Sequence, residues 1–386
     1  MAKNYSNKES RASLIFTWIL IILIAIGSFM IFKNYKDNYS DIIKNDELAQ
    51  ALSTAFDKPV GKITTDDLAS VNAIAFNLFE ESLLNNSQSI AINSSEKKNY
   101  ITEATFLLND TNYSALIPYD EFLNYLNYFS GIKSFTLERQ TSLTYILGME
   151  DPDSTVFDMN KLPSETFKNL ENIYVSNVAV NNANSLGNHK NLKTLQLNNT
   201  GINDISSFNS LTSLEALAFN GDDFSDISAL ESLTNLKTLV IAGNNITDVS
   251  TVKNLTNLEG LALSGNKITD VTAIENLSAL KELSVTDTTI TALPSFEKLT
   301  ALEVIDLSNN GLTDISALSV LNNDKVKNVY LTGNAIEDFS PIAHIAEDKI
   351  TKDEPEEENE EVEEEKEDTK TNDSTSTEEK TDNAEQ

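Results

Sequence analysis

The sequence predicts an α/β solenoid in which short parallel strands line a concave face. The same segment recurs at intervals of 22 residues from Leu170 to Leu302, and an eighth copy begins at Val326 after a two-residue insertion. Each copy opens with an apolar-x-x-apolar-x-apolar hexamer, and the eight hexamers are LENIYV, LKTLQL, LEALAF, LKTLVI, LEGLAL, LKELSV, LEVIDL and VKNVYL. An apolar segment precedes the repeats and an acidic segment follows them.

Five parts are therefore expected along the chain. They are a cytoplasmic N-terminus (1–13), a transmembrane signal anchor (14–32), a helical cap with an irregular, α-rich region (40–165), the solenoid of eight repeats (170–347) and a disordered acidic tail (348–386). Within the third part, a helix is expected over Asn72–Leu84, and only Ile132-x-x-Phe135-x-Leu137 has the spacing of a repeat strand.

The segment Leu14–Phe32 predicts a membrane helix. It contains no charged residue and approaches the roughly 20 residues that a spanning helix needs. Lys3, Lys8 and Arg11 precede it against the single acid Glu9, which favours a cytoplasmic N-terminus and an exported remainder. A cleaved signal peptide is the alternative, but the apolar run is longer than such peptides need.

Polar columns of the repeat have structural explanations. Asn residues three positions after the hexamer are expected to bond backbone groups in the turn that leaves each strand. A column of Asp residues falls where a convex turn should begin, which indicates N-capping of that turn rather than metal binding. The second hexamer position alternates Glu and Lys, as in Glu171 and Lys193, so stacked repeats are expected to pair opposite charges. The Asp column comprises Asp204, Asp226, Asp248, Asp270, Asp314 and Asp338.

These features together form the leucine-rich-repeat pattern, and the 22-residue unit resembles that of the internalins, which are bacterial surface proteins. Asp46–Leu52 and Lys62–Leu68 are similar to the helical cap that begins internalin repeat domains. The resemblance implies a bacterial plasma-membrane protein with extracellular repeats. The chain departs from the family in the residues between cap and repeats, and it lacks both an immunoglobulin-like module after the repeats and an LPxTG-like sorting signal.

Composition excludes several functions. The chain has no cysteine and a formal net charge of -32, which disfavours thiolate chemistry and nucleic-acid binding. His189 and His344 lie about seven repeats apart and cannot form one site. No nucleophile elbow, phosphate-binding glycine loop or zinc spacing occurs. We therefore expect neither an enzyme nor a cofactor or metal. The tail beyond 347 is rich in Glu, Asp, Lys, Thr and Ser, which predicts disorder.

The concave face is the expected binding surface. Its outward positions are small in the centre, with a tyrosine at either end, which predicts a shallow groove for a protein partner, or alternatively a glycan. The function expected is that of an adhesin-like or receptor-like binder. The alternative is a cell-envelope scaffold that organises the same cell's membrane or wall proteins, which the membrane segment and the missing sorting signal favour. The candidate partner-binding residues are Tyr174, Gln196, Asn198, Asn220, Val240, Glu282, Asp306 and Tyr330.

Overall fold

A computed structural model describes residue 43 and residues 46–80, 100–118, 121, 123–139 and 156–353. The expected cytoplasmic N-terminus (1–13) and signal anchor (14–32) lie outside the described residues, as does the tail from residue 354 onward. Within the described ranges, no helix has both the length and the apolar character needed to span a membrane.

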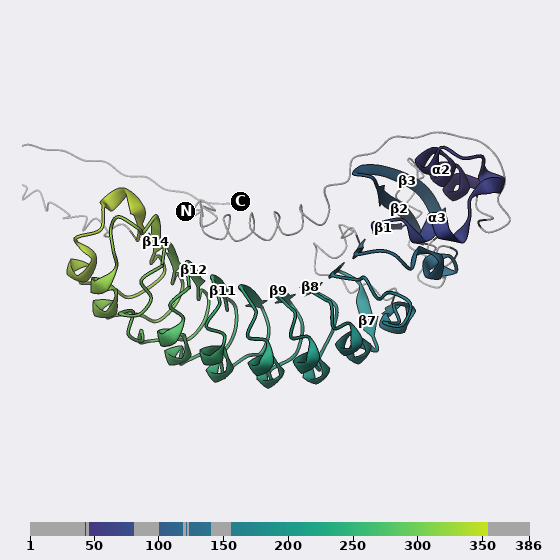
Figure 1. The fold of residues 1–386 in the computed structure, drawn as a ribbon. Helices are drawn as coiled ribbons and strands as arrows, with labels where there is room; N and C mark the ends of the chain where they lie inside the picture. The colour runs from purple at the N-terminus through teal and green to yellow at the C-terminus, as the bar shows by residue number, and fades with distance from the viewer. Residues whose placement is uncertain are drawn as a thin grey trace, which may run out of the picture. The chain divides into compact units, whose positions relative to one another are not determined.

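The described strands form one long sheet of 13 strands in the order β15-β14-β13-β12-β11-β10-β9-β8-β6-β4-β1-β2-β3. From β6 onward, neighbours are parallel and stack in register, so that Leu195 pairs with Leu217 and Leu217 with Leu239. Figure 1 shows these strands along the inner side of the curve, which confirms the predicted solenoid. The repeat strands are β6 (Asn172–Ser176), β8 (Thr194–Asn198), β9 (Ala216–Asn220), β10 (Thr238–Ala242), β11 (Gly260–Ala262), β12 (Glu282–Ser284), β13 (Val304–Asp306) and β14 (Asn328–Tyr330).

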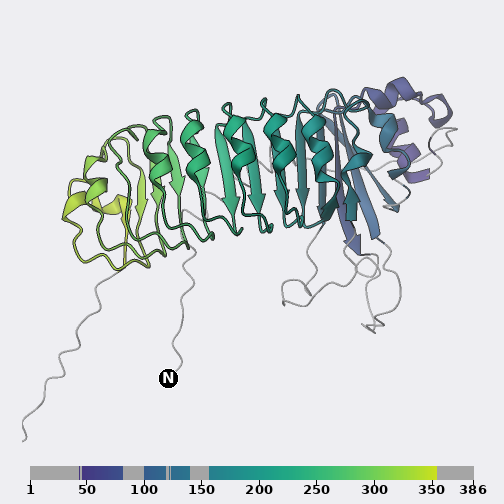
Figure 2. The same ribbon diagram turned by 90° about the horizontal axis from the view of Figure 1, so that it is seen from below.

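The convex side consists of short 3₁₀ helices, which Figure 2 shows in a row in front of the strands. The expected Asp column caps them: the Ser228 N–H donates to Asp226 Oδ1 at 2.8 Å, and the equivalent bond recurs in five other repeats. Each carboxylate thus satisfies a helix N–H that lacks an internal partner. The capped helices are η5 (Ser206–Ser210), η6 (Ser228–Ser232), η7 (Ser250–Asn254), η8 (Thr272–Asn276), η9 (Ser316–Val320) and η10 (Ser340–Ile342). A further convex helix, η4 (Ala183–Asn188), is not capped by the Asp column.

The predicted asparagine ladder is present inside the turns. Asn266 Nδ2 donates to the Ile241, Leu263 and Ser264 carbonyls at 2.8–3.3 Å, while its Oδ1 accepts from the Ile246 N–H at 3.1 Å. The residue immediately before this position, such as Gly265 (φ +67°), is left-handed in repeat after repeat, which explains why it is Gly, Asn or Asp. Leucine and isoleucine columns that are almost fully buried fill the space between the two faces.

The N-terminal part corrects the expectation of an irregular, α-rich region. Asn72–Leu84 does not begin a helix; Ala73–Glu80 is strand β1, parallel to β4 (Ser134–Arg139) and antiparallel to β2 (Tyr100–Leu108). The physical reason is that AIAF is apolar throughout and is buried between β2 and β4, with Ile74 and Phe76 on the core side of the sheet. β3 (Thr111–Pro118) completes the edge. The expected repeat strand at Ile132–Leu137 is confirmed as β4, which pairs with β6.

Both ends of the solenoid are covered. The expected N-terminal cap is helical: α2 (Asp46–Phe56) packs against β3, and α3 (Thr65–Ala69) begins with a capping box between Thr64 and Asp67. At the other end, ordered chain continues past the predicted boundary at residue 347, because β15 (Ile350–Thr351) pairs with β14.

The remaining elements are short. They are η1 (Val60–Lys62), η2 (Leu126–Phe129), η3 (Met159–Lys161), η11 (Glu347–Lys349), and the two-stranded sheet of β5 (Val156–Asp158) and β7 (Ala179–Asn181).

Candidate functional site

Three rows of side chains point outward from the concave face, because alternate residues of a strand face opposite sides. The middle row runs through Thr136, Tyr174 and Gln196 to Ala218 and onward along the solenoid. From β4 to β14 the charged residues in the three rows are all acids, and neither Lys nor Arg occurs in them. The acids are Glu138, Glu282 and Asp306.

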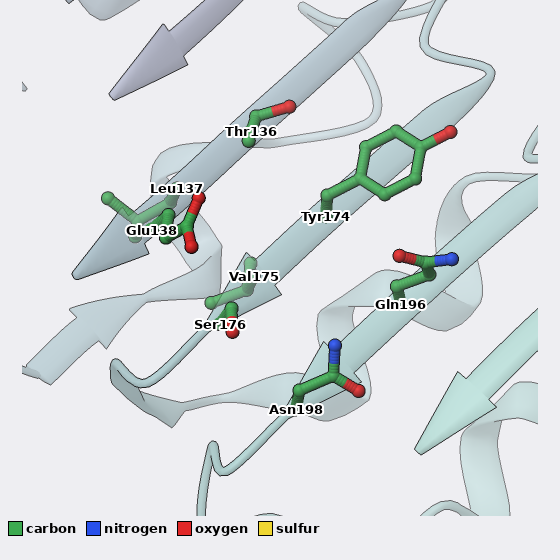
Figure 3. Close-up of a pocket in the computed structure, with 8 residues that line it drawn as sticks. All are labelled: Thr136, Leu137, Glu138, Tyr174, Val175, Ser176, Gln196 and Asn198. Carbon is green, nitrogen blue, oxygen red and sulfur yellow. The ribbon is translucent and has the colours of Figure 1, made fainter. Parts of the chain in front are cut away.

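A small hollow of about 30 Å³ lies on this face where β4, β6 and β8 meet. A hollow of this size holds about two water molecules or one small polar group. Figure 3 shows the carboxamide of Gln196 beside the Tyr174 ring, with the Glu138 carboxylate on the far strand. The hollow is lined by Thr136, Leu137, Glu138, Tyr174, Val175, Ser176, Gln196 and Asn198.

Gln196 is the most unusual residue of this hollow. Its side chain is 2% exposed, yet neither Oε1 nor Nε2 has a hydrogen-bond partner. A buried polar group without a partner destabilises a fold by roughly 1–3 kcal/mol, so such groups are rare in structural roles. The amide offers both donors and an acceptor, which suits a peptide group of a ligand.

The Glu138 carboxylate is a second group without a hydrogen-bond or ion-pair partner among the described residues. Its side chain is partly buried, and this burial raises the pKa of the carboxyl above its ordinary value. No described residue donates a hydrogen bond to it or forms an ion pair with it. The hollow therefore combines a desolvated carboxylate with an unpaired amide, an arrangement that favours a ligand carrying positive charge and hydrogen-bond donors.

The other lining residues are positioned by the protein itself. Burial raises the pKa of the Tyr174 hydroxyl, with the Thr194 side chain hydrogen-bonded to it as an opposing influence. Asn220 Nδ2 donates to Asn198 Oδ1 at 2.6 Å, which fixes the Asn198 amide with its nitrogen toward the hollow (Figure 3). These contacts leave the aromatic ring of Tyr174 and the nitrogen of Asn198 oriented along the edge of the site.

The eight predicted residues therefore separate into groups. Tyr174, Gln196 and Asn198 line the hollow, and Asn220 supports it through Asn198. Val240 lies partly buried at the centre of the concave face.

The remaining three predicted residues lie near the far end. Burial raises the pKa of both Glu282 and Asp306, and the Glu303 charge adds to the effect at Glu282. Asp306 Oδ1 accepts from the Ser308 N–H at 3.0 Å, and Tyr330 is buried against Val304. The two tyrosines are thus not brought together.

Sequence reasoning missed Thr136 and Glu138. The signal was present, because Phe135-x-Leu137 was identified as a repeat strand and its alternate residues must face the concave side.

Other conspicuous residues are structural. His189 is buried, with Nε2 2.7 Å from the Leu162 carbonyl oxygen, and burial lowers its pKa. The Glu/Lys column forms discrete pairs rather than a continuous ladder: Lys237 bonds Glu215 at 2.6 Å, and three equivalent pairs recur. The described ranges contain no group of three or more His, Cys, Asp or Glu side chains that could hold a metal ion.

Comparison with known proteins supports the repeat assignment. A family model described as leucine-rich repeats (2 copies) matches residues 234–276, 278–320 and 300–344. No curated protein matches the chain. An internalin from Listeria monocytogenes is 22% identical over 81% of this chain and 95% of its own, with a TM-score of 0.53.

Two further solved structures are less similar. Internalin C2 from Listeria monocytogenes is 19% identical, with a TM-score of 0.39 over 82% of this chain and 100% of its own. A plant peptide hormone receptor, solved in complex with RGF2, is 16% identical, with a TM-score of 0.42 over 54% of this chain and 34% of its own. The family model thus places leucine-rich repeats within residues 234–344, and the fold of the chain is similar to that of the solved internalin.

Proposed function

We propose that this chain is a membrane-anchored, outward-facing protein without enzymatic activity, which binds a protein partner through its concave face. The observation that carries the proposal is Gln196, a buried amide on that face whose hydrogen-bonding atoms have no partner within the protein. Its neighbour Glu138 is likewise unmatched. Two polar groups left unsatisfied in one hollow of the concave face favour a role in recognition.

The shape of the face favours an extended ligand. The centre of the face carries Ala216, Ala218, Gly260 and Ala262, and no long side chain rises from the sheet at these four positions. A chain lying across the strands would contact one repeat about every 4.8 Å. A protein segment is preferred over a glycan because the unpaired amide matches the donor and acceptor of a peptide group.

Photo-cross-linking in the producing cells tests this function. A photoreactive amino acid replaces Val240 on the concave face, and in a matched control it replaces Lys253 on the convex helix η7. We expect protein adducts from position 240 only, and we expect Gln196→Met to reduce them strongly. Equal adducts from both positions, or adducts unaffected by Gln196→Met, would contradict binding through the concave face.

The identity of the adducts also separates the two forms of the function. Adducts with proteins of the cell's own envelope would favour the scaffold that organises membrane or wall proteins. Adducts that form only with proteins added from outside would favour the adhesin-like or receptor-like binder. Protease treatment of intact cells tests the orientation: an outward-facing chain loses its C-terminal tail while residues 1–13 are protected.

A further inference from the structure

The hollow at β4, β6 and β8 has properties that indicate the chemistry of its ligand. Two of its groups, the Glu138 carboxylate and the Gln196 carboxamide, lack partners, and they lie on strands separated only by β6. Two strand spacings, together with the offset of two residues along the strands, amount to about 12 Å. This separation is too long for one small ion to contact both groups, but it is suited to two neighbouring groups of a single extended chain.

We propose that this hollow recognises a lysine residue within an extended segment of the partner protein. On binding, the Gln196 side chain turns its buried amide into the hollow to pair with a main-chain peptide group of the segment, and the lysine ammonium forms an ion pair with Glu138. This assignment rests on the proposed function and names the chemistry of its ligand.

Charge supports a basic ligand. The three concave rows from β4 to β14 contain acids and no Lys or Arg, so no basic residue of these rows repels a cation. Lys193, three residues before Gln196, is already bound to Glu171. An acidic peptide would be repelled along the same surface.

The hollow suits an ammonium group better than a metal ion. A volume of about 30 Å³ accommodates an ammonium group, which is compact and carries three donors. A calcium ion needs six to eight oxygen ligands. The hollow supplies one carboxylate, and the described residues contain no metal-binding group of three.

The side chains around the hollow fit this arrangement. The Tyr174 ring lies beside Gln196 in Figure 3 and provides an aromatic surface for the four-carbon stem of a lysine. Asn198, held by Asn220, directs an amide nitrogen toward the same space and can donate to a ligand carbonyl. The ligand would thus gain main-chain hydrogen bonds from two side chains of β8 and one charge contact from β4.

Selection from a random peptide library tests the assignment. Dodecamers with blocked ends are selected on the purified full-length chain, on the Glu138→Gln variant and on Glu231→Gln, a matched control on the convex helix η6. We expect lysine to be enriched at one position for the unaltered chain and for Glu231→Gln, but not for Glu138→Gln. A selected peptide should bind Glu138→Gln about tenfold more weakly, in keeping with loss of a partly desolvated charge pair.

Chemical variants of a selected peptide complete the test. Acetylation of its lysine, or replacement by norleucine, should weaken binding to the unaltered chain as much as Glu138→Gln does. Selected peptides without a lysine preference, or equal binding to Glu138→Gln, would overturn the lysine assignment while leaving concave-face binding intact. Selection of no sequence would count against both, and cross-linking at position 240 then decides whether the face binds protein at all. Thermal melting of Glu138→Gln at or above that of the unaltered chain excludes misfolding as the cause.

Discussion

Two buried carboxamides in this molecule have opposite surroundings. In the turns, Asn266 makes four hydrogen bonds to backbone groups of its own and the preceding repeats. On the concave face, Gln196 is equally buried and makes none within the protein. Burial alone therefore does not reveal the role of a polar residue. The role depends on whether the protein supplies the hydrogen-bond partners. For Asn266, the turn supplies all four.

The same contrast applies to carboxylates on the two faces. On the convex side, Asp226 accepts the first helical N–H of η6, and this hydrogen bond lowers the pKa of its carboxyl. On the concave side, burial without a partner raises the pKa of Glu138. The convex charges stabilise the helices locally, whereas the concave charge is desolvated by the fold without a compensating contact.

The largest effect is expected from Asn266→Ala. The substitution removes four hydrogen bonds and leaves buried backbone groups of two repeats unsatisfied, so the free energy of unfolding should fall by about 3 kcal/mol. Urea denaturation of the full chain measures it. Asn245→Ala, which removes an amide bonded to Lys267 at the turn surface, is the matched control and should cost less than about 0.5 kcal/mol. Similar losses of unfolding free energy in both variants would show that the asparagine ladder stabilises the chain no more than a surface amide does.

Asp222 tests the ladder from within, because it occupies the asparagine position of its repeat. Its Oδ1 accepts from the N–H groups of Thr200 and Ile202, but Oδ2 is buried without a partner, and burial raises the pKa of this carboxyl above 3.8. An acid with a raised pKa stabilises the fold fully below its unfolded pKa, and this contribution is lost as pH rises through the folded pKa.

Asp222→Asn should therefore stabilise the chain at pH 7.5 by about 1–2 kcal/mol, since an amide can donate to the turn carbonyls as Asn266 does. The gain should shrink as pH falls toward 4, which urea denaturation at several pH values measures. Asp248→Asn is the control with the opposite sign, because the Ser250 N–H lowers the pKa of Asp248, and its contribution is lost as pH falls. A gain for Asp222→Asn that is independent of pH would contradict its titration.

The repeat region was predictable because each repeat has the same spacing of apolar and polar positions. Spacing alone located the strands from Leu170 onward, the capping role of the Asp column and the asparagine turns. The strand at Ala73–Glu80 was not predicted, since an eight-residue apolar segment fits a helix or a strand and only pairing with β4 decides between them.

The site was predictable only in part, for a related reason. The concave positions of Tyr174, Gln196 and Asn198 follow from alternation, but nothing in the sequence shows that Gln196 lacks a partner while Asn198 has one. That difference depends on the sizes of the neighbours across the strands. The distance between the two tyrosines likewise depends on the stacking of whole repeats, which places Tyr330 against Val304 rather than near the hollow.

The smallest change is expected from Gln196→Met, and its small size is what makes it informative. Methionine has the length of glutamine without its polar atoms, so the two unsatisfied groups disappear while the contacts with Tyr174 and Ala218 remain. The free energy of unfolding should stay unchanged or rise by up to about 1 kcal/mol in urea denaturation. A loss comparable with that of Asn266→Ala would show that Gln196 is structural. Unchanged stability combined with weaker cross-linking from position 240 would instead assign this amide to the ligand, because only an interaction formed on binding can vanish without cost to the free chain.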